Sequence, residues 1–209
     1  MTQRDLISTV EATDVAPRAA IYRPTVYVYE APVRAWHWVN ALCLFVLAPT
    51  GYLIASPLPS IGGEASEHFL MGYVRFAHFA AGQVMAVAFL GRILWAFLGN
   101  QHARQLFYLP VHSARYWREA LFEARWYLFL EKYPKKYVGH NPLAHAAMFL
   151  MFTLTSLFMI VSGFALYSEG AGVDSLSHRL FGWVFALWPN SQMIHTWHHA
   201  GMWVLGVFV

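Results

Sequence analysis

Cysteine and charge are both scarce in this sequence of 209 residues. The single cysteine, Cys43, excludes an internal disulfide, an iron–sulfur cluster held by thiolates and the Cys-x-x-Cys-His attachment of c-type haem. Charged residues make up 12% of the chain and hydrophobic residues 58%, which is not the balance of a soluble globular domain. The sequence also contains no Walker loop, GxGxxG motif or zinc-finger spacing, and nothing in it indicates a nucleic-acid partner.

Four apolar windows with very few charges follow one another along the chain. They cover residues 37–55, residues 71–99, residues 143–167 and a stretch that begins near Ile194 and stops at Val209. The first three are close to the roughly 20 residues that span a bilayer, so they favour a membrane protein over the alternative of a large soluble helical core. The first 34 residues lack the apolar stretch of a cleavable signal, so we expect the first window to act as an uncleaved insertion signal.

Lysine and arginine alternate between the segments that flank these windows. There are four before the first window, none in the first loop, seven in the second loop and one in the third. The positive-inside rule then predicts a cytoplasmic N-terminus, with the first and third loops on the outer side. The overall basic charge therefore comes from cytoplasmic flanks.

The second loop contains a segment of mixed charge and apolar character, SARYWREALFEARWYLFLE, at residues 113–131. Its helical spacing predicts an amphipathic helix on the cytoplasmic membrane surface, and a soluble helical hairpin is equally compatible. The predicted fold class is thus an all-α membrane protein, a bundle of four transmembrane helices with a cytoplasmic amphipathic helix between helices 2 and 3. We expect residues 1–26 to be a disordered cytoplasmic N-terminus, and residues 27–209 to form the membrane domain, with its fourth helix truncated.

Histidines near the ends of the windows are the main candidates for function. A single histidine there is most simply a rim residue that reaches the lipid headgroups, so the argument depends on pairs. His78 lies about 10 Å below the outer surface, at a depth similar to that of the three histidines at 195, 198 and 199 that open the fourth window. Two imidazoles that face each other in a helix bundle suit a low-spin haem b. His37, on the inner side, has candidate partners in His140, in His145 or beyond Val209.

Two of these histidines share a local pattern, Arg-x-x-His-aromatic. It occurs as Arg34 with His37 and again as Arg75 with His78. Residues three apart lie on one face of a helix, so each arginine is a candidate partner for the propionates of a haem bound by its histidine. Ordinary cationic flanking of a membrane helix is the alternative for either arginine alone.

Five stretches resemble a known family, in the same order and spacing over most of the chain. They are RAWHWVNALCLFVLAPTG, MGYVRFAHFAAG, GHNPLAHAAMF, SGFALYSE and IHTWHHAGMW. They resemble the membrane cytochrome b subunit of respiratory nickel–iron hydrogenases and, more distantly, that of formate dehydrogenases. The resemblance implies a di-haem b protein of the bacterial inner membrane that passes electrons from the iron–sulfur small subunit of a periplasm-facing hydrogenase to quinone. It also implies that the nickel–iron large subunit is a partner and that this chain itself catalyses no bond-making chemistry.

The resemblance also implies ligands for the haem irons. His78 and His198 match the pair that holds the outer, proximal haem, and His37 matches a ligand of the inner, distal haem. The fourth ligand of the family corresponds to position 212, about four helical turns and roughly 21 Å beyond His198. The sequence stops at Val209, so we expect a truncated or missing tail.

The formate dehydrogenase pattern further implies that Asn141 contacts quinone, although an asparagine before a proline is also an ordinary way to begin a helix. Two alternatives to the hydrogenase function remain. One is the cytochrome subunit of another quinone-linked enzyme, such as formate dehydrogenase or thiosulfate reductase. The other is a histidine-lined transporter for a divalent metal, which the near absence of Asp and Glu from the windows disfavours. His195 and His199 are expected to be rim residues, with hydrogen-bond partners or polar groups on the quinol side as the alternative.

Overall fold

The computed structural model describes residues 27–59, 64 and 68–209, and all regular elements in this part of the chain are helical. The predicted disordered segment, residues 1–26, lies outside the described residues. The helices are α1 (Ala31–Ala55), α2 (Leu70–Leu98), η2 (Ala103–Leu106), α3 (Ala114–Tyr127), α4 (Pro142–Ala147), η3 (Met148–Leu154), α5 (Thr155–Ala171), α6 (Leu176–Phe181), α7 (Val184–Leu187) and α8 (Ser191–Phe208).

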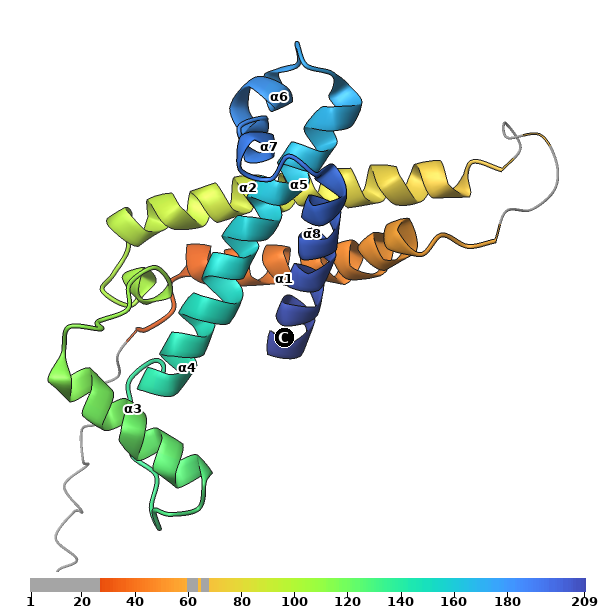
Figure 1. Cartoon of the computed structure of the whole chain (residues 1–209). Coiled ribbons are helices and arrows are strands. Elements are labelled where there is room, and N and C mark those ends of the chain that lie inside the picture. The colour runs from red at the N-terminus through yellow and green to blue at the C-terminus, as the bar shows by residue number, and fades with distance from the viewer. Residues whose placement is uncertain (1–26, 60–63, 65–67) are drawn as a thin grey trace, which may run out of the picture.

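Two helix pairs form the centre of the molecule. Helices α1 and α2 run side by side, and α5 and α8 form a second pair that crosses the first (Figure 1). Helix α5 continues α4 and η3 without a break, so the three together make one long helix. Because α8 also contacts α1 and α5 also contacts α2, side chains from all four helices can meet at the crossing.

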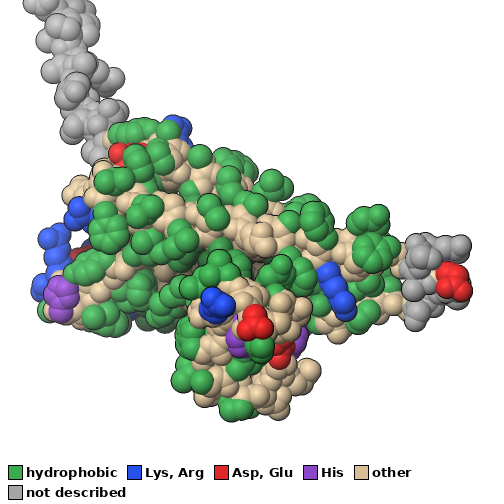
Figure 2. Space-filling model, turned by 90° about the horizontal axis from the view of Figure 1, so that it is seen from above, with side chains coloured by type: hydrophobic (Ala, Val, Ile, Leu, Met, Phe, Trp, Pro, Cys, Tyr) green, Lys and Arg blue, Asp and Glu red, His purple; other side chains and the backbone are tan. Residues whose placement is uncertain are grey.

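Among the described residues, three helices are long and apolar enough to cross a membrane, namely α1, α2 and the continuous helix Pro142–Ala171. Their outer faces carry large hydrophobic side chains, and Phe45 and Phe97 are 79% and 74% exposed. Figure 2 shows such side chains spread over much of the visible surface. The first three predicted windows thus coincide with helices of membrane-spanning length. The 18-residue α8 is not among these helices, so the fourth crossing remains a prediction.

Short polar residues begin several of the helices. Ser113, Asn141 and Asn190 precede α3, α4 and α8, and each side-chain oxygen accepts a hydrogen bond from a backbone N–H in the first turn. Such caps satisfy N–H groups that have no partner within the helix. Helix α3 lies within the predicted amphipathic segment, and its place at a membrane surface remains a prediction. The helices α6 and α7 of the third loop were not predicted.

A π-helical segment, η3, forms part of the long helix near its start. Within it, the Thr153 hydroxyl shares its single proton between the carbonyl oxygens of Leu106 (2.9 Å) and Met148 (3.2 Å). The first of these bonds joins the long helix to η2, which follows α2 in the chain. The second loop is therefore fixed against the helices rather than free of them.

Candidate haem site

His78 of α2 and His198 of α8 face each other where the two helix pairs cross. Their ring centroids are 6.4 Å apart and their planes are inclined at 72°. Both side chains are half-buried. Helices α2 and α8 do not run side by side. The two imidazoles therefore approach each other only because the α1–α2 pair crosses the α5–α8 pair.

The spacing of the two rings fits a single metal ion between them. An imidazole nitrogen binds a transition-metal ion at about 2 Å, which places two imidazoles on opposite sides of one ion with centroids roughly 6 Å apart. In the described part of the chain, no three His, Cys, Asp or Glu side chains gather as a metal site. Two histidines alone suit a haem iron, because the macrocycle supplies the other four ligands.

Sequence reasoning missed two hydroxyls that contact this pair. Thr50 Oγ1 of α1 lies 3.0 Å from His78 Nδ1, and Ser162 Oγ of α5 lies 2.8 Å from His198 Nδ1. Each hydroxyl residue is followed directly by a glycine. The repeated Thr-Gly and Ser-Gly pairs, one in each of two spans, are the signal that sequence reasoning had available.

In the described part of the chain, the hydrogen bonds of the other two histidines at the start of α8 lie within that helix. His195 Nδ1 lies 3.1 Å from the carbonyl oxygen of Ser191, one turn earlier. His199 Nε2 accepts a 3.3 Å hydrogen bond from Trp203, one turn later. Of the three, His198 is therefore the one placed against another histidine.

His37 is exposed near the start of α1, and its ring contact is with its neighbour Trp38. Among the described residues no second histidine lies against it. Arg34 donates a 3.3 Å hydrogen bond to the hydroxyl of Tyr27, and Arg75 is exposed on α2. The structure thus brings together the two histidines at one end and leaves His37 apart from them.

The candidate partners of His37 within the chain make other contacts. His145 donates from Nε2 to the carbonyl oxygen of Gln105 at 2.6 Å. His140 lies beside Tyr29, whose hydroxyl is 3.2 Å from its Nδ1. Burial, together with the nearby His145, lowers the pKa of His140 below its ordinary value and favours the neutral ring. Asn141 Oδ1 accepts from the N–H of Ala144 at 2.7 Å as the cap of α4.

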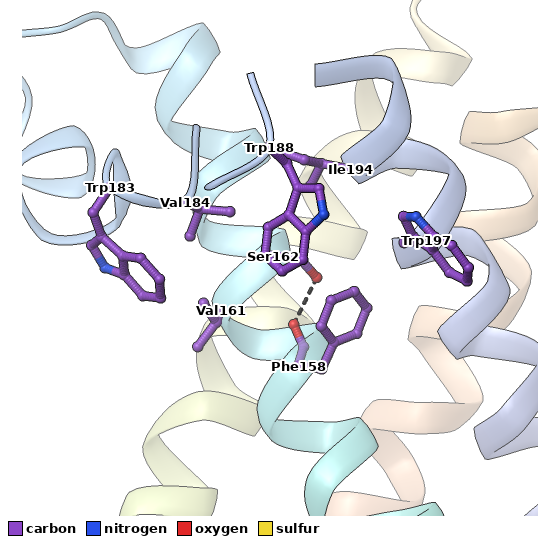
Figure 3. Close-up of a pocket in the computed structure, with 8 residues that line it drawn as sticks. All are labelled: Phe158, Val161, Ser162, Trp183, Val184, Trp188, Ile194 and Trp197. Carbon is purple, nitrogen blue, oxygen red and sulfur yellow. Dashed lines mark hydrogen bonds between the residues drawn. The ribbon is translucent and has the colours of Figure 1, made fainter. Parts of the chain in front are cut away.

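A cavity of about 280 Å³ lies beside Ser162, on the side of α5 that faces α7 and α8. Trp183, Trp188 and Trp197 line it, and Figure 3 shows them around the Ser162 hydroxyl, whose hydrogen bond to the Phe158 carbonyl is drawn. The walls are almost entirely apolar. Apolar surroundings restrict water near a metal site and so influence its redox potential.

Comparison with known proteins gives the family. The family described as prokaryotic cytochrome b561 matches residues 28–209. A "Probable Ni/Fe-hydrogenase B-type cytochrome subunit" of Bradyrhizobium diazoefficiens is 68% identical over 198 residues, which cover 95% of this chain and 80% of the relative. A protein with the same description in Rhizobium leguminosarum is 64% identical, with 95% of this chain and 83% of the relative covered. A "Probable Ni/Fe-hydrogenase 1 B-type cytochrome subunit" of Escherichia coli K12 is 51% identical, with 88% and 78% covered.

The family match, the long apolar helices and the pair of histidines support the same conclusion. The match covers residues 28–209 and so includes both His78 and His198. The long apolar helices are those of an integral membrane protein. The chain therefore belongs to the prokaryotic cytochrome b561 family of b-type cytochromes, and its cofactor is haem b.

Proposed function

We propose that this chain is the membrane subunit that carries electrons from a nickel–iron hydrogenase to quinone. The observation that carries the proposal is the pair of facing imidazoles, His78 and His198, 6.4 Å apart between helices α2 and α8. A haem held by two histidines exchanges one electron between its ferric and ferrous states and keeps no open position for a substrate. The pair therefore supports electron transfer, and bond-making chemistry belongs to partner subunits.

The names of the relatives support the hydrogenase as partner. All three relatives described above carry the description of a hydrogenase B-type cytochrome subunit, and the E. coli protein is still 51% identical. We infer that this chain receives electrons from the iron–sulfur small subunit, which is bound to the nickel–iron large subunit. The small subunit would dock at the end of the molecule where α8 begins, because His198 lies near that end.

A second, distal haem is part of the same proposal. His37 would supply one of its ligands, since it is exposed on α1 and makes no contact with another histidine in the part of the chain that is described. Arg34 and Arg75 lie one helical turn before His37 and His78, and both are exposed, so they are available to bind propionates.

Quinone would bind near the start of α4. Asn141 Oδ1 is occupied by the helix cap, so its side-chain NH₂ is the group left to donate a hydrogen bond to a quinone carbonyl. The residue is half-buried between the second loop and the long helix. A contact of this kind would put quinone near the end of the molecule that holds His37.

We further propose that four helices cross the bacterial inner membrane, with the N-terminus in the cytoplasm and the hydrogenase on the periplasmic side. The distribution of lysine and arginine supports this orientation. Helix α3 would lie on the cytoplasmic surface, because Trp117 and Leu121 are 55% and 61% exposed while Tyr116 holds the helix to the carbonyl oxygen of Pro142.

Membranes that contain the intact complex provide the test. Hydrogen should reduce a b-type haem, seen in the reduced-minus-oxidised spectrum, and added quinone should reoxidise it. Formate in place of hydrogen is the matched control and should leave the haem oxidised. Reduction by formate but not by hydrogen would assign the chain to a formate dehydrogenase and contradict the proposal. Uptake of a divalent metal without any b-type absorbance would instead indicate a transporter.

A further inference from the structure

The two histidines of the haem site are held in the same way by two different helices. Thr50 on α1 contacts Nδ1 of His78 on α2, at 3.0 Å. Ser162 on α5 contacts Nδ1 of His198 on α8, at 2.8 Å. Each helix pair thus supplies one imidazole and one hydroxyl, and in both cases the hydroxyl meets Nδ1 rather than Nε2.

The protons of the two hydroxyls are already used. Thr50 Oγ1 lies 2.6 Å from the carbonyl oxygen of Val46, and Ser162 Oγ lies 2.7 Å from that of Phe158, each four residues earlier (Figure 3 for Ser162). A hydroxyl has one proton to donate, and a carbonyl oxygen can only accept. Each hydroxyl oxygen therefore accepts from an imidazole Nδ1–H. The neutral ring then has no proton on Nε2, which leaves that nitrogen free to bind a metal.

The glycine after each hydroxyl residue provides room for the same ring. A Cβ added to Gly51 would lie 3.1 Å from Cε1 of His78, and a Cβ added to Gly163 would lie 3.1 Å from Cε1 of His198. Such a distance is too short for an unstrained contact. The Thr-Gly and Ser-Gly pairs therefore combine a hydrogen-bond acceptor with a flat surface for the imidazole, once for each histidine.

We propose that Thr50 and Ser162 are positioning residues that fix His78 and His198 as Nδ1–H tautomers, with Nε2 directed to the haem iron. The inference rests on the proposed function, because it takes the two histidines as the iron ligands. A hydrogen bond from Nδ1–H makes the opposite nitrogen a stronger electron donor. Because a stronger donor stabilises ferric over ferrous iron, the two hydroxyls keep the midpoint potential of this haem low.

Replacement of each hydroxyl in the intact membrane complex tests the inference. Thr50→Val and Ser162→Ala remove one acceptor each with little change in volume. We expect the haem to remain bound, with roughly tenfold weaker retention, a more positive midpoint potential and a changed low-spin electron paramagnetic resonance signal. Thr50→Ser keeps a hydroxyl at this position, so its midpoint potential should be that of the unmodified complex rather than that of Thr50→Val. A change in potential caused only by lost packing would not follow the hydroxyl in this way.

Matched controls exist on α8 and α5, two of the helices that meet at the crossing. The Thr196 hydroxyl on α8 donates to the carbonyl oxygen of Gln192 at 2.9 Å, as Thr50 does to Val46, but among the described residues Thr196 makes no hydrogen bond to an imidazole. Ser156 on α5 is fully buried, and its hydroxyl has no partner among the described residues. Thr196→Val and Ser156→Ala should therefore leave the midpoint potential and the resonance signal unchanged.

The outcomes separate this inference from the function on which it rests. An unchanged potential and signal in both Thr50→Val and Ser162→Ala, with haem retained, would overturn the inference and leave the ligand pair in place. Retention of the same haem in His78→Ala or His198→Ala would instead show that the ligand pair itself is wrong. Should Thr50→Val not assemble, Ser162→Ala decides the question alone.

Discussion

Polar side chains at the two ends of the α1–α2 pair have different partners. At the end where α1 finishes and α2 begins, which we name the His78 end, Thr50 and Ser162 contact imidazoles on other helices. At the end where α1 begins and α2 finishes, which we name the His37 end, Glu30 and Asn100 contact mainly backbone. The first set of contacts orients side chains, and the second set holds chain segments together.

The contacts of the His37 end join the start of α1 to the end of α2. Glu30 Oε2 accepts hydrogen bonds from Trp95 Nε1 and from the backbone N–H of Asn100, both at 3.0 Å. Asn100 Nδ2 donates to the carbonyl oxygens of Tyr27 and Val28, both at 3.1 Å. These hydrogen bonds hold the segment before α1 against the segment after α2, and none of them involves His37.

Arg92, in the second span, makes contacts of the same kind as those of the His37 end. Its side chain is 4% exposed and donates a 2.7 Å hydrogen bond to the carbonyl oxygen of Ala103 in η2. The guanidinium lies over the rings of Trp36 and Phe107, at 5.6 and 5.5 Å from their centroids. An ionisable residue within a membrane helix is usually suspected of function, but here its contacts are those of a helix junction. Partners, rather than depth alone, distinguish the two kinds of residue.

The largest expected effect comes from the histidines themselves. His78→Ala or His198→Ala removes one of two iron ligands and should abolish the haem that they share, measured as b-type absorbance per complex. His37→Ala should leave that haem in place, because His37 lies apart from the pair. His199→Ala is the matched control beside His198. If His37→Ala and His78→Ala removed the same haem, the distinction between the two ends would be wrong.

Asn100→Ala should weaken the His37 end without altering the haem of the His78 end. The change deletes the hydrogen bonds to Tyr27 and Val28 and those accepted from the backbone N–H groups of His102 and Ala103. We expect a loss of about 2 kcal/mol in stability, because backbone groups at the junction lose their partners. Thermal unfolding of the complex measures the effect.

The control for this change is a simpler cap on another helix. Asn190→Ala removes one side-chain bond at the start of α8, to the N–H of Gln192, and should cost about 1 kcal/mol. A shift in the haem midpoint potential of Asn100→Ala would contradict the separation of the two ends. An unfolding temperature equal to that of the unmodified complex would contradict the structural role of Asn100.

The sequence was sufficient to predict most of the helices and the identity of the family. Windows of apolar residues predicted α1, α2 and the long helix Pro142–Ala171, since length and hydropathy are properties of consecutive residues. The resemblance to hydrogenase cytochromes is confirmed by relatives up to 68% identical among those described. The number of residues from the outer end of each window also predicted similar membrane depths for His78 and His198, whose rings do lie against each other.

Contacts between distant segments were harder to predict. The hydroxyl of Thr50 meets His78 only because α1 and α2 lie side by side, and a threonine in a span is ordinarily a packing residue. The short helices α6 and α7 also escaped prediction, since six and four residues are too few for a clear periodic pattern. The ligand roles of His37, His78 and His198, and the quinone role of Asn141, remain predictions.

A smaller effect is expected from the glycines that contact the imidazoles. Gly163→Ala puts a methyl group 3.1 Å from Cε1 of His198, so the ring must shift by a few tenths of an ångström, at a cost of about 1 kcal/mol. The low-spin resonance signal should change, because it reports the angle between the two imidazole planes. Gly170→Ala, on the same helix with nothing within 4 Å, should leave the signal unchanged. Equal behaviour of the two variants would contradict close packing at the His78 end.

The smallest effect concerns α3, near the His37 end. A hydrogen bond from the Lys135 ammonium, with a second from the Tyr137 hydroxyl, both at 2.9 Å, lowers the pKa of the Glu119 carboxyl below its ordinary value. The stabilisation from this carboxylate is therefore complete above the ordinary pKa of a glutamate and is lost as the pH falls through the lowered pKa. Hydrogen exchange of residues 113–140, corrected for its intrinsic pH dependence, should become faster over that acid range. Glu119→Gln should remove the pH dependence, and its persistence in this variant would show that another group holds α3 to the following segment.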